Sequence, residues 1–300
     1  MIALLDALLA QTPAADVSGS AQINLVQALV LGIVQGLTEF LPISSSAHLK
    51  VVPIALGWGD PGVAYTAVIQ LGSIIAVLWY FWKDLTNITV GAVEAVVQRN
   101  YKSHEFQMAV ALVLGTIPIV FFGLLIKALV PDFDKSPLRS LASIAIASIV
   151  MSLLLATAEK IGKRNRTYEK LTVLDGILMG LAQAIALIPG CSRSGSTLTA
   201  GLFMGLERPA AARFSFLLGI PAITLAGLVE LKGDLAQGIG DAGVAALIVG
   251  TISSFVFSYL SIAWLMKFLQ TQKTWIFVLY RLAFGVAILT ALAGGAVKNV

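Results

Sequence analysis

The sequence predicts an all-α integral membrane protein with six transmembrane helices and two re-entrant helical hairpins in an inverted-topology repeat. Of its 300 residues, 58% are hydrophobic and only 12% are charged, which is too apolar for a soluble domain. The apolar segments follow one another without a long polar interval. Two of the segments are interrupted by polar turns that contain proline. These observations indicate a single polytopic membrane domain.

We expect residues 1–21 to form an N-terminal extension and residues 22–300 to form the membrane domain. The extension is apolar at its start but has no basic region, so a cleaved signal peptide ending near Ala14 and Ala15 is left as an alternative. The net charge of +4 is assigned to cytoplasmic loops and not to nucleic-acid binding. The single cysteine, Cys191, excludes an intrachain disulfide and a cysteine metal cluster.

Six segments are long enough to cross a membrane, which takes roughly 20 apolar residues. The apolar segment before Pro42 and the short one after it are not counted among them, because the second piece is too short to cross alone. The six expected spans are Ala64–Trp82, Phe106–Val130, Leu138–Ala156, Arg213–Leu231, Ala242–Met266 and Trp275–Ala293.

The charges of the loops orient these spans. The basic run 160–166 is assigned to the cytoplasm, together with the loop expected at 83–105. In that orientation, segments 24–57 and 171–206 each begin and end on one side of the membrane. Each must therefore enter the membrane and return, one hairpin from each face.

Three spans follow each hairpin, which predicts two inverted repeats. Repeat A covers about 22–157 and repeat B about 171–293. In such repeats the binding site lies near the membrane midplane, where broken helices meet. We therefore expect the two polar turns, Gln35–His48 and Pro189–Thr197, to meet there and bind a phosphate ester.

The first turn offers a carboxylate, hydroxyl groups and an imidazole. Gln35 and Glu39 are four residues apart and share one face of a helix that stops before Pro42. His48 falls in the first turn of the returning helix and can reach back towards its cap. Backbone N–H groups and serine hydroxyls at a helix N-terminus form an anion site. The serines at this position are Ser44, Ser45 and Ser46.

The second turn repeats this arrangement and adds a cation. Pro189 and Gly190 break the helix, and Arg193 supplies a planar positive group suited to phosphate oxygens. The other expected binding residues are Ser192 and Ser194 as caps, Gly195 for close backbone approach, and Thr197 in the first helical turn.

Each of these residues also has a structural interpretation. Glu39 and Arg193 can form a buried ion pair that only holds the repeats together. Arg281 lies near a span end, where its side chain can extend to the membrane surface, and Asp175 can serve only as a helix cap. Ionisable residues inside a membrane are energetically costly and usually functional, which favours the phosphate site.

A hydrolytic mechanism follows from these groups. Ser45 or a water molecule attacks phosphorus, and His48 acts as base and then as acid. Arg193 and the helix N-termini neutralise the phosphate oxygens. Glu39 either holds a divalent cation together with Gln35, or orients His48; the sequence leaves both alternatives open.

Two motifs resemble a known family. Gln35–His48 (QGLTEFLPISSSAH) is similar to the acidic motif and adjoining serine–histidine stretch of bacterial undecaprenyl-diphosphate phosphatases, the bacitracin-resistance family. Pro189–Thr197 (PGCSRSGST) resembles the family's PGxSRSxxT motif, and 210–221 also resembles that family. Gln35 stands where some members have glutamate, and an amide would be a weaker metal ligand.

The resemblance implies hydrolysis of undecaprenyl diphosphate to the monophosphate lipid carrier used in cell-wall (peptidoglycan) synthesis, and hence bacitracin resistance. It implies dependence on a divalent cation, Mg²⁺ or Ca²⁺, and a location in the bacterial inner membrane with a site reached from the outer face. Glu39, Ser45, His48 and Arg193 would be catalytic. Membrane lipid is the expected surrounding, and a homodimer is among the assemblies that the sequence leaves open.

The alternative function is a lipid-phosphate flippase, because inverted repeats with re-entrant hairpins are more typical of transporters than of hydrolases. A flippase needs the same phosphate site but no nucleophile beside a base. Ser45 and His48, three residues apart, favour hydrolysis.

Overall fold

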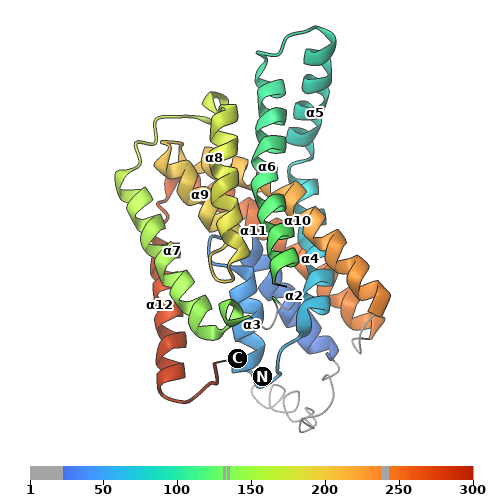
Figure 1. The fold of residues 1–300 in the computed structure, drawn as a ribbon, viewed down its shortest axis with the longest axis vertical. Coiled ribbons are helices and arrows are strands. Elements are labelled where there is room, and N and C mark those ends of the chain that lie inside the picture. The colour runs from blue at the N-terminus through green and yellow to red at the C-terminus, as the bar shows by residue number, and fades with distance from the viewer. Residues whose placement is uncertain (1–22, 131–132, 134–135, 238–242, 300) are drawn as a thin grey trace.

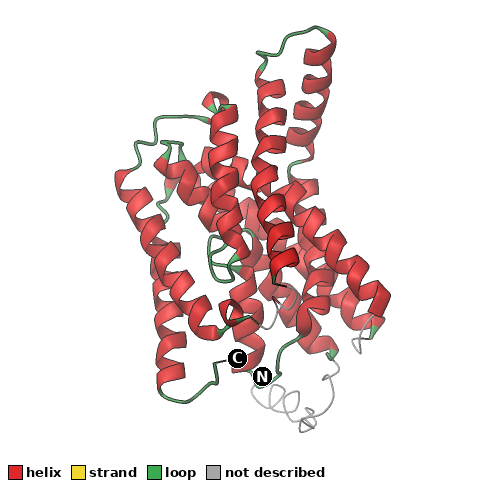
Figure 2. Ribbon diagram, viewed as in Figure 1, coloured by secondary structure: helices red, strands yellow, loops and turns green. Residues whose placement is uncertain are grey.

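A computed structural model describes residues 23–130, 133, 136–237 and 243–299, and the regular structure of this part is helical (Figures 1 and 2). The expected extension 1–21 lies outside the described residues. The helices are α2 (Leu25–Glu39), α3 (Ser45–Ala55), α4 (Gly62–Tyr80), α5 (Trp82–Val97), α6 (His104–Leu129), η2 (Pro137–Arg139), α7 (Leu141–Ile161), η3 (Tyr168–Lys170), α8 (Val173–Ala184), η4 (Ile185–Leu187), α9 (Arg193–Phe203), α10 (Arg208–Gln237), α11 (Val244–Thr271) and α12 (Trp275–Ala293).

The described chain contains five helices that are individually long and apolar enough to cross a membrane. They are α6, α7, α10, α11 and α12. A sixth span is obtained only if α4 and α5 are counted together, and these two helices are bent by 65° at their junction. The protein is thus a multi-pass helical membrane protein, in agreement with the class predicted from composition.

The segment 83–105 was expected to be a loop, and this expectation is wrong for most of its length. Residues Trp82–Val97 form α5, which packs beside α6 in a helical hairpin at one end of the molecule (Figure 1). The segment contains no proline, and Asp84 lies in the first turn of the helix, where an acidic side chain is favourable. The charges of the segment occupy the surface of a helix and do not interrupt it.

Each polar turn connects two short helices. The helix breaks expected at Pro42 and at Pro189–Gly190 lie between α2 and α3 and between η4 and α9. Ser44 and Ser192 directly precede α3 and α9, with left-handed φ values of 77° and 70°. Residues other than glycine seldom adopt this conformation, so both turns share an uncommon backbone path.

Glycines allow the first helix of each pair to approach a long helix closely. A Cβ atom at Gly36 of α2 would lie 2.7 Å from the carbonyl oxygen of Ser254 in α11. A Cβ atom at Gly176 of α8 would lie 2.5 Å from the carbonyl oxygen of Ala111 in α6. Small residues at such crossings replace side-chain contact by backbone contact, which is how membrane helices commonly pack.

Ion pairs join the helices near the end where α7 is connected to α8. Glu159, 3% exposed, is paired with Arg208 and accepts a hydrogen bond of 2.8 Å from the Thr274 hydroxyl. Asp175 caps α8, as expected, and pairs with Arg166 at 2.9 Å. This hydrogen bond to Asp175 raises the pKa of the Arg166 guanidinium above its ordinary value. A third pair joins Asp84 of α5 to Arg213 of α10.

Candidate functional site

The two polar turns are in direct contact. The Ser194 hydroxyl donates a hydrogen bond of 2.9 Å to the carbonyl of Leu41 in the other turn. Arg281 of α12, 1% exposed, donates to the carbonyls of Pro42 at 3.2 Å and Gly190 at 2.7 Å. The sequence placed Arg281 near the membrane surface, and that interpretation is wrong. Its guanidinium lies between the turns because Arg281 is on the buried face of α12, which packs against α7.

Glu39 lies at the centre of the hydrogen-bond network between the turns. Its Oε2 atom accepts from the Ser45 hydroxyl at 2.7 Å and from Nε2 of Gln35 at 3.1 Å. Its Oε1 atom is 3.3 Å from Nη2 of Arg193. Gln35 also donates to the Ser73 hydroxyl at 3.3 Å. The structure therefore brings a carboxylate, a hydroxyl and a guanidinium from both hairpins into one buried cluster.

Arg193 has unused hydrogen-bonding capacity. Its Nη1 atom makes only a long contact, 3.5 Å, with the carbonyl of Ser215. Its Nε atom is buried and has no hydrogen-bond partner among the described residues. Buried donors are almost always paired, so an unpaired guanidinium nitrogen on a residue that contacts Glu39 is suited to bind an anion.

Both ring nitrogens of His48 have hydrogen-bond partners other than the Ser45 hydroxyl. Its Nδ1 atom lies 2.7 Å from the carbonyl oxygen of Ser44, so the expected contact back to the cap is present. Its Nε2 atom lies 2.6 Å from the Tyr280 hydroxyl, and the ring stacks on Phe284 with centroids 4.4 Å apart. The spacing of three residues suggested a pair between Ser45 and His48, whereas the structure pairs Ser45 with Glu39.

The remaining predicted binding residues shape the two turns. The Ser192 hydroxyl accepts from the backbone N–H of Gly195 at 3.1 Å, so it caps α9 as expected. Ser44 makes no such cap; its hydroxyl lies 3.2 Å from that of Ser46. Thr197 donates to the carbonyl of Arg193 at 2.9 Å.

The glycines bring backbones together. Gly190 has a φ of 92° and lies so close to α7 that a Cβ atom there would be 2.6 Å from the carbonyl oxygen of Ile144. A Cβ atom at Gly195 would lie 2.8 Å from Nη1 of Arg281. At both positions a larger residue would collide with a neighbouring group, so glycine is needed for the close packing of the second turn and the start of α9.

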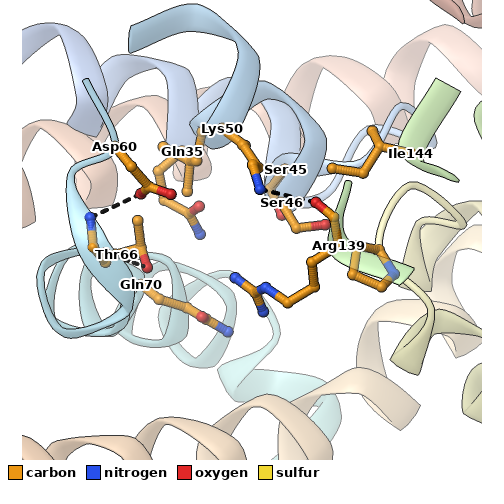
Figure 3. Close-up of a pocket in the computed structure, with 12 residues that line it drawn as sticks. Gln35, Ser45, Ser46, Lys50, Asp60, Thr66, Gln70, Arg139 and Ile144 are labelled. Carbon is orange, nitrogen blue, oxygen red and sulfur yellow. Dashed lines mark hydrogen bonds between the residues drawn. The ribbon is translucent and has the colours of Figure 1, made fainter. Parts of the chain in front are cut away.

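A polar cavity of about 160 Å³ adjoins this cluster (Figure 3). Gln35 and Ser45 line it from the cluster side, and Pro189 lines it from the second turn. Glu39, His48 and Arg193 are not among its lining residues. The cavity thus reaches the proposed nucleophile but not the whole cluster. The other lining residues are Ser46, Leu49, Lys50, Asp60, Gly62, Thr66, Gln70, Arg139 and Ile144.

The cluster contains few ligands for a metal ion. The described residues include no group of three or more His, Cys, Asp or Glu side chains placed to hold one. Glu39 is the one carboxylate of the cluster, and Gln35 uses Nε2 for both of its hydrogen bonds, which leaves its amide oxygen for another ligand. Mg²⁺ is commonly held by one or two carboxylates plus substrate phosphates, and the residues present fit that mode.

Four residues of the network were not singled out by sequence analysis as parts of the site. They come from helices outside the two hairpins, and of the four only Ser215 lies in a segment, 210–221, that resembles the family; the four residues are Ser73, Ser215, Tyr280 and Arg281. Arg281 carried the clearest signal, because a guanidinium within an apolar segment is costly unless it is paired.

The fold and this cluster define a class: a multi-pass helical membrane protein with a buried carboxylate–serine–arginine site where two broken helices meet. The chain belongs to the family described as bacitracin resistance protein BacA, whose model matches residues 28–287.

Cyanobacterial relatives are similar over most of the chain. A protein of Synechocystis sp. named undecaprenyl-diphosphatase is 69% identical over 279 residues, 93% of this chain and 86% of that protein. One of the same name from Trichormus variabilis is 67% identical over 281 residues, 94% of this chain and 88% of the relative. Another from Gloeobacter violaceus is 55% identical, covering 93% of this chain and 96% of the relative.

Proposed function

We propose that this protein hydrolyses undecaprenyl diphosphate to undecaprenyl phosphate and inorganic phosphate. The observation that carries the proposal is the cluster in which Ser45 donates to Glu39 while Arg193, with an unpaired Nε, lies against the same carboxylate. The names of the relatives support the lipid diphosphate as substrate. The product would return as the lipid carrier for peptidoglycan synthesis, and its recycling would confer bacitracin resistance.

Phosphate binding is assigned to the second hairpin and to the start of α3. Arg193 and the N-terminal backbone amides of α3 and α9 supply positive charge to the phosphate oxygens. Ser44, Ser46, Ser192 and Ser194 provide hydroxyls around them, while Gly190, Gly195 and Thr197 fix the backbone that presents them. Stabilising the charge on the phosphate oxygens is the main task in phosphoryl transfer.

The chemistry is assigned to Ser45. Its hydroxyl attacks the terminal phosphorus, Glu39 accepts the hydroxyl proton, and the bond to the oxygen of the departing lipid monophosphate breaks. Water then hydrolyses the phosphoserine and restores the hydroxyl. The 2.7 Å hydrogen bond from Ser45 to Glu39 supports Glu39 as the base of the first step. Direct attack by water remains the alternative.

His48 is proposed to transfer a proton in the later step, the hydrolysis of the phosphoserine. Its ring contacts the carbonyl of Ser44 and the hydroxyl of Tyr280, so it adjoins the nucleophile along the backbone. Comparison of His48→Gln with Glu39→Gln separates the two candidate bases. The base that serves the first step should control the rate of the initial burst of undecaprenyl phosphate, and the base that serves the later step should control steady release of inorganic phosphate.

A divalent cation, Mg²⁺ or Ca²⁺, is proposed to bind to Glu39 and Gln35 together with substrate oxygens. It would supply further positive charge to the diphosphate. The pairing of Glu39 with Arg193 fits a carboxylate that is shared between a fixed and an exchangeable cation.

The proposed topology has six spans and two re-entrant hairpins, with repeat A at about 22–157 and repeat B at about 171–293. It is supported by the two helix breaks, by the left-handed serine at each, and by the matching glycine contacts of α2 and α8. The protein would lie in the inner membrane with its site open to the outer face. A homodimer is compatible with this arrangement.

The decisive experiment measures phosphate release from undecaprenyl diphosphate by the purified protein, with and without a chelator. Arg193→Ala and His48→Ala are assayed beside the wild type, each checked for an unchanged elution profile in detergent. Metal-dependent release that collapses in both variants is expected. If a well-folded wild type releases no phosphate, the hydrolase proposal is wrong.

The repeated hairpins also favour a second candidate, a lipid-phosphate flippase. Movement of a labelled lipid phosphate across liposomes that contain the protein, without hydrolysis, would identify this function. Loss of movement in Arg193→Ala but not in Ser45→Ala would show that the anion site is used without its nucleophile.

A further inference from the structure

The cavity beside Ser45 has a cationic end that the proposed hydrolysis does not use. Figure 3 shows the guanidinium of Arg139 and the amide of Gln70 directed into the space that Gln35 reaches from the opposite side. Lys50 lies on the rim near Arg139. These groups come from η2, α4, α2 and α3, so the cavity is assembled by the fold and is not a feature of one loop.

The lining carries net positive charge. Lys50 and Arg139 are its cations, and Asp60 is its one acidic residue. Nζ of Lys50 donates 2.9 Å to the backbone carbonyl of Arg139, a neutral acceptor that orients the ammonium group without cancelling its charge. Asp60 accepts a hydrogen bond of 2.9 Å from the backbone N–H of Gly62, which holds the carboxylate at the start of α4.

The cationic end is continuous with the proposed reaction site. Lys50 lies on α3 one turn beyond Ser46, and residues four apart share a helix face. Ser45, Ser46 and Lys50 all line the same cavity. Its volume of about 160 Å³ exceeds the roughly 10–15 Å³ needed by one water, so a hydrated anion can be accommodated.

We propose that Lys50 and Arg139 form a second anion site, which holds a phosphate group between the reaction site and the end of the molecule where α3 terminates. This inference rests on the proposed function. The ligand chemistry is a phosphate dianion or diphosphate, which two cations and an amide can bind by charge-assisted hydrogen bonds. Its source is either the inorganic phosphate that leaves or the head group of the lipid that arrives.

The test compares Lys50→Met and Arg139→Gln with the charge-preserving Lys50→Arg. The matched control is Lys127→Met, which removes an exposed lysine in the last turn of α6 and does not line the cavity. The readouts are the inhibition constant for inorganic phosphate and KM for undecaprenyl diphosphate. A lost charge-assisted hydrogen bond of ~1.4 kcal/mol or more corresponds to about a tenfold weakening, and we expect at least that for one of the two constants.

A raised inhibition constant with unchanged KM identifies released phosphate as the ligand. A raised KM identifies the incoming head group. Lys127→Met should resemble the wild type in both constants, and Lys50→Arg, which keeps the charge, should be less affected than Lys50→Met. If neither constant changes in Lys50→Met or Arg139→Gln, the second site is refuted while the hydrolase proposal stands.

An independent measurement covers the case of an inactive wild type. Added inorganic phosphate should raise the apparent Tm of the wild type, because a ligand that binds only the folded state stabilises it. The rise should shrink in Lys50→Met and persist in Lys127→Met. An equal rise in both variants contradicts the second site, whatever the activity.

Discussion

The guanidinium of Arg281 donates a hydrogen bond of 2.7 Å to the carbonyl oxygen of Gly190, and thereby fixes the turn of the second hairpin to α12. Its other terminal nitrogen reaches the carbonyl of Pro42 in the first hairpin. One side chain from outside both hairpins therefore bridges the two turns, in addition to the direct contacts between them.

Replacing Arg281 by lysine should loosen this link. Lysine keeps the charge but loses the planar fork that contacts two carbonyls at once. We expect about a tenfold or greater fall in kcat/KM for phosphate release and a lower apparent Tm. Arg99→Lys, at an exposed position beyond α5, serves as the control. Equal activity of Arg281→Lys and wild type would mean that the turns need no such link.

Gly219→Ala tests the position of Arg193 without touching either turn. A Cβ atom at Gly219 would overlap Nη1 of Arg193, so the guanidinium must move away from Glu39. Phosphate release should fall about a hundredfold while the elution profile stays unchanged. Gly227→Ala on the same helix meets only the ends of the Ile74 and Leu71 side chains, at 3.2 Å and 3.8 Å, and should retain activity.

Ser45→Ala distinguishes serine from water as nucleophile. A serine nucleophile predicts a fall in turnover of about a thousandfold or more. It also predicts that rapid acid quenching of the wild type traps label from the terminal phosphate on the protein. Ser148→Ala, which removes a buried hydroxyl without a partner in the described chain, is the control. Substantial turnover by Ser45→Ala without trapped label would assign the attack to water.

Gln35→Glu should strengthen cation binding. A carboxylate in place of the neutral amide supplies a second charged ligand beside Glu39. After removal of metal, titration with Mg²⁺ or Ca²⁺ should restore phosphate release at several-fold lower concentration than in the wild type. The exposed substitution Gln98→Glu should leave the titration unchanged. An unaltered half-saturation in Gln35→Glu would exclude Gln35 as a ligand.

Glu159→Gln should affect stability and leave the chemistry alone. It removes the charged partner of Arg208 at a buried position, a change that typically costs about 3–5 kcal/mol. Thermal unfolding in detergent should show a clear fall in apparent Tm, with the cation dependence of phosphate release retained. Glu169→Gln, at an exposed position in η3, should unfold like the wild type.

Local patterns in the sequence predicted the helix breaks and the polar groups within each turn, because both depend on neighbouring residues. Pro42 and Pro189–Gly190 lie where helices end, as expected of a residue without a backbone N–H, although Pro118 and Pro221 lie inside α6 and α10. Ser192 caps α9 through a residue three positions away. The contact between the two turns was predicted from an orientation of the spans by loop charge, in which both segments return to the face that they entered from; the contact is present, and this orientation stays a prediction.

Partners between distant helices could not be predicted in this way. The contact between His48 and Tyr280 spans 232 residues and depends on how α12 lies against α7. Without that packing, the spacing of Ser45 and His48 suggested a pair that the structure does not contain. The charged residues of segment 83–105 similarly suggested a loop. A helix with charged residues on its exposed face has the same composition, so composition alone does not distinguish the two.

Helices α3 and α9 are eleven residues long, which at 1.5 Å per residue is about 16 Å. This is roughly half the ~30 Å apolar thickness of a bilayer. In the proposed topology, an anionic head group must therefore descend below the plane of its neighbouring lipids before it reaches Ser45. The thickness of the host membrane then sets the depth to which the head group must move. The length of the two helices would accordingly have to match the apolar thickness of that membrane.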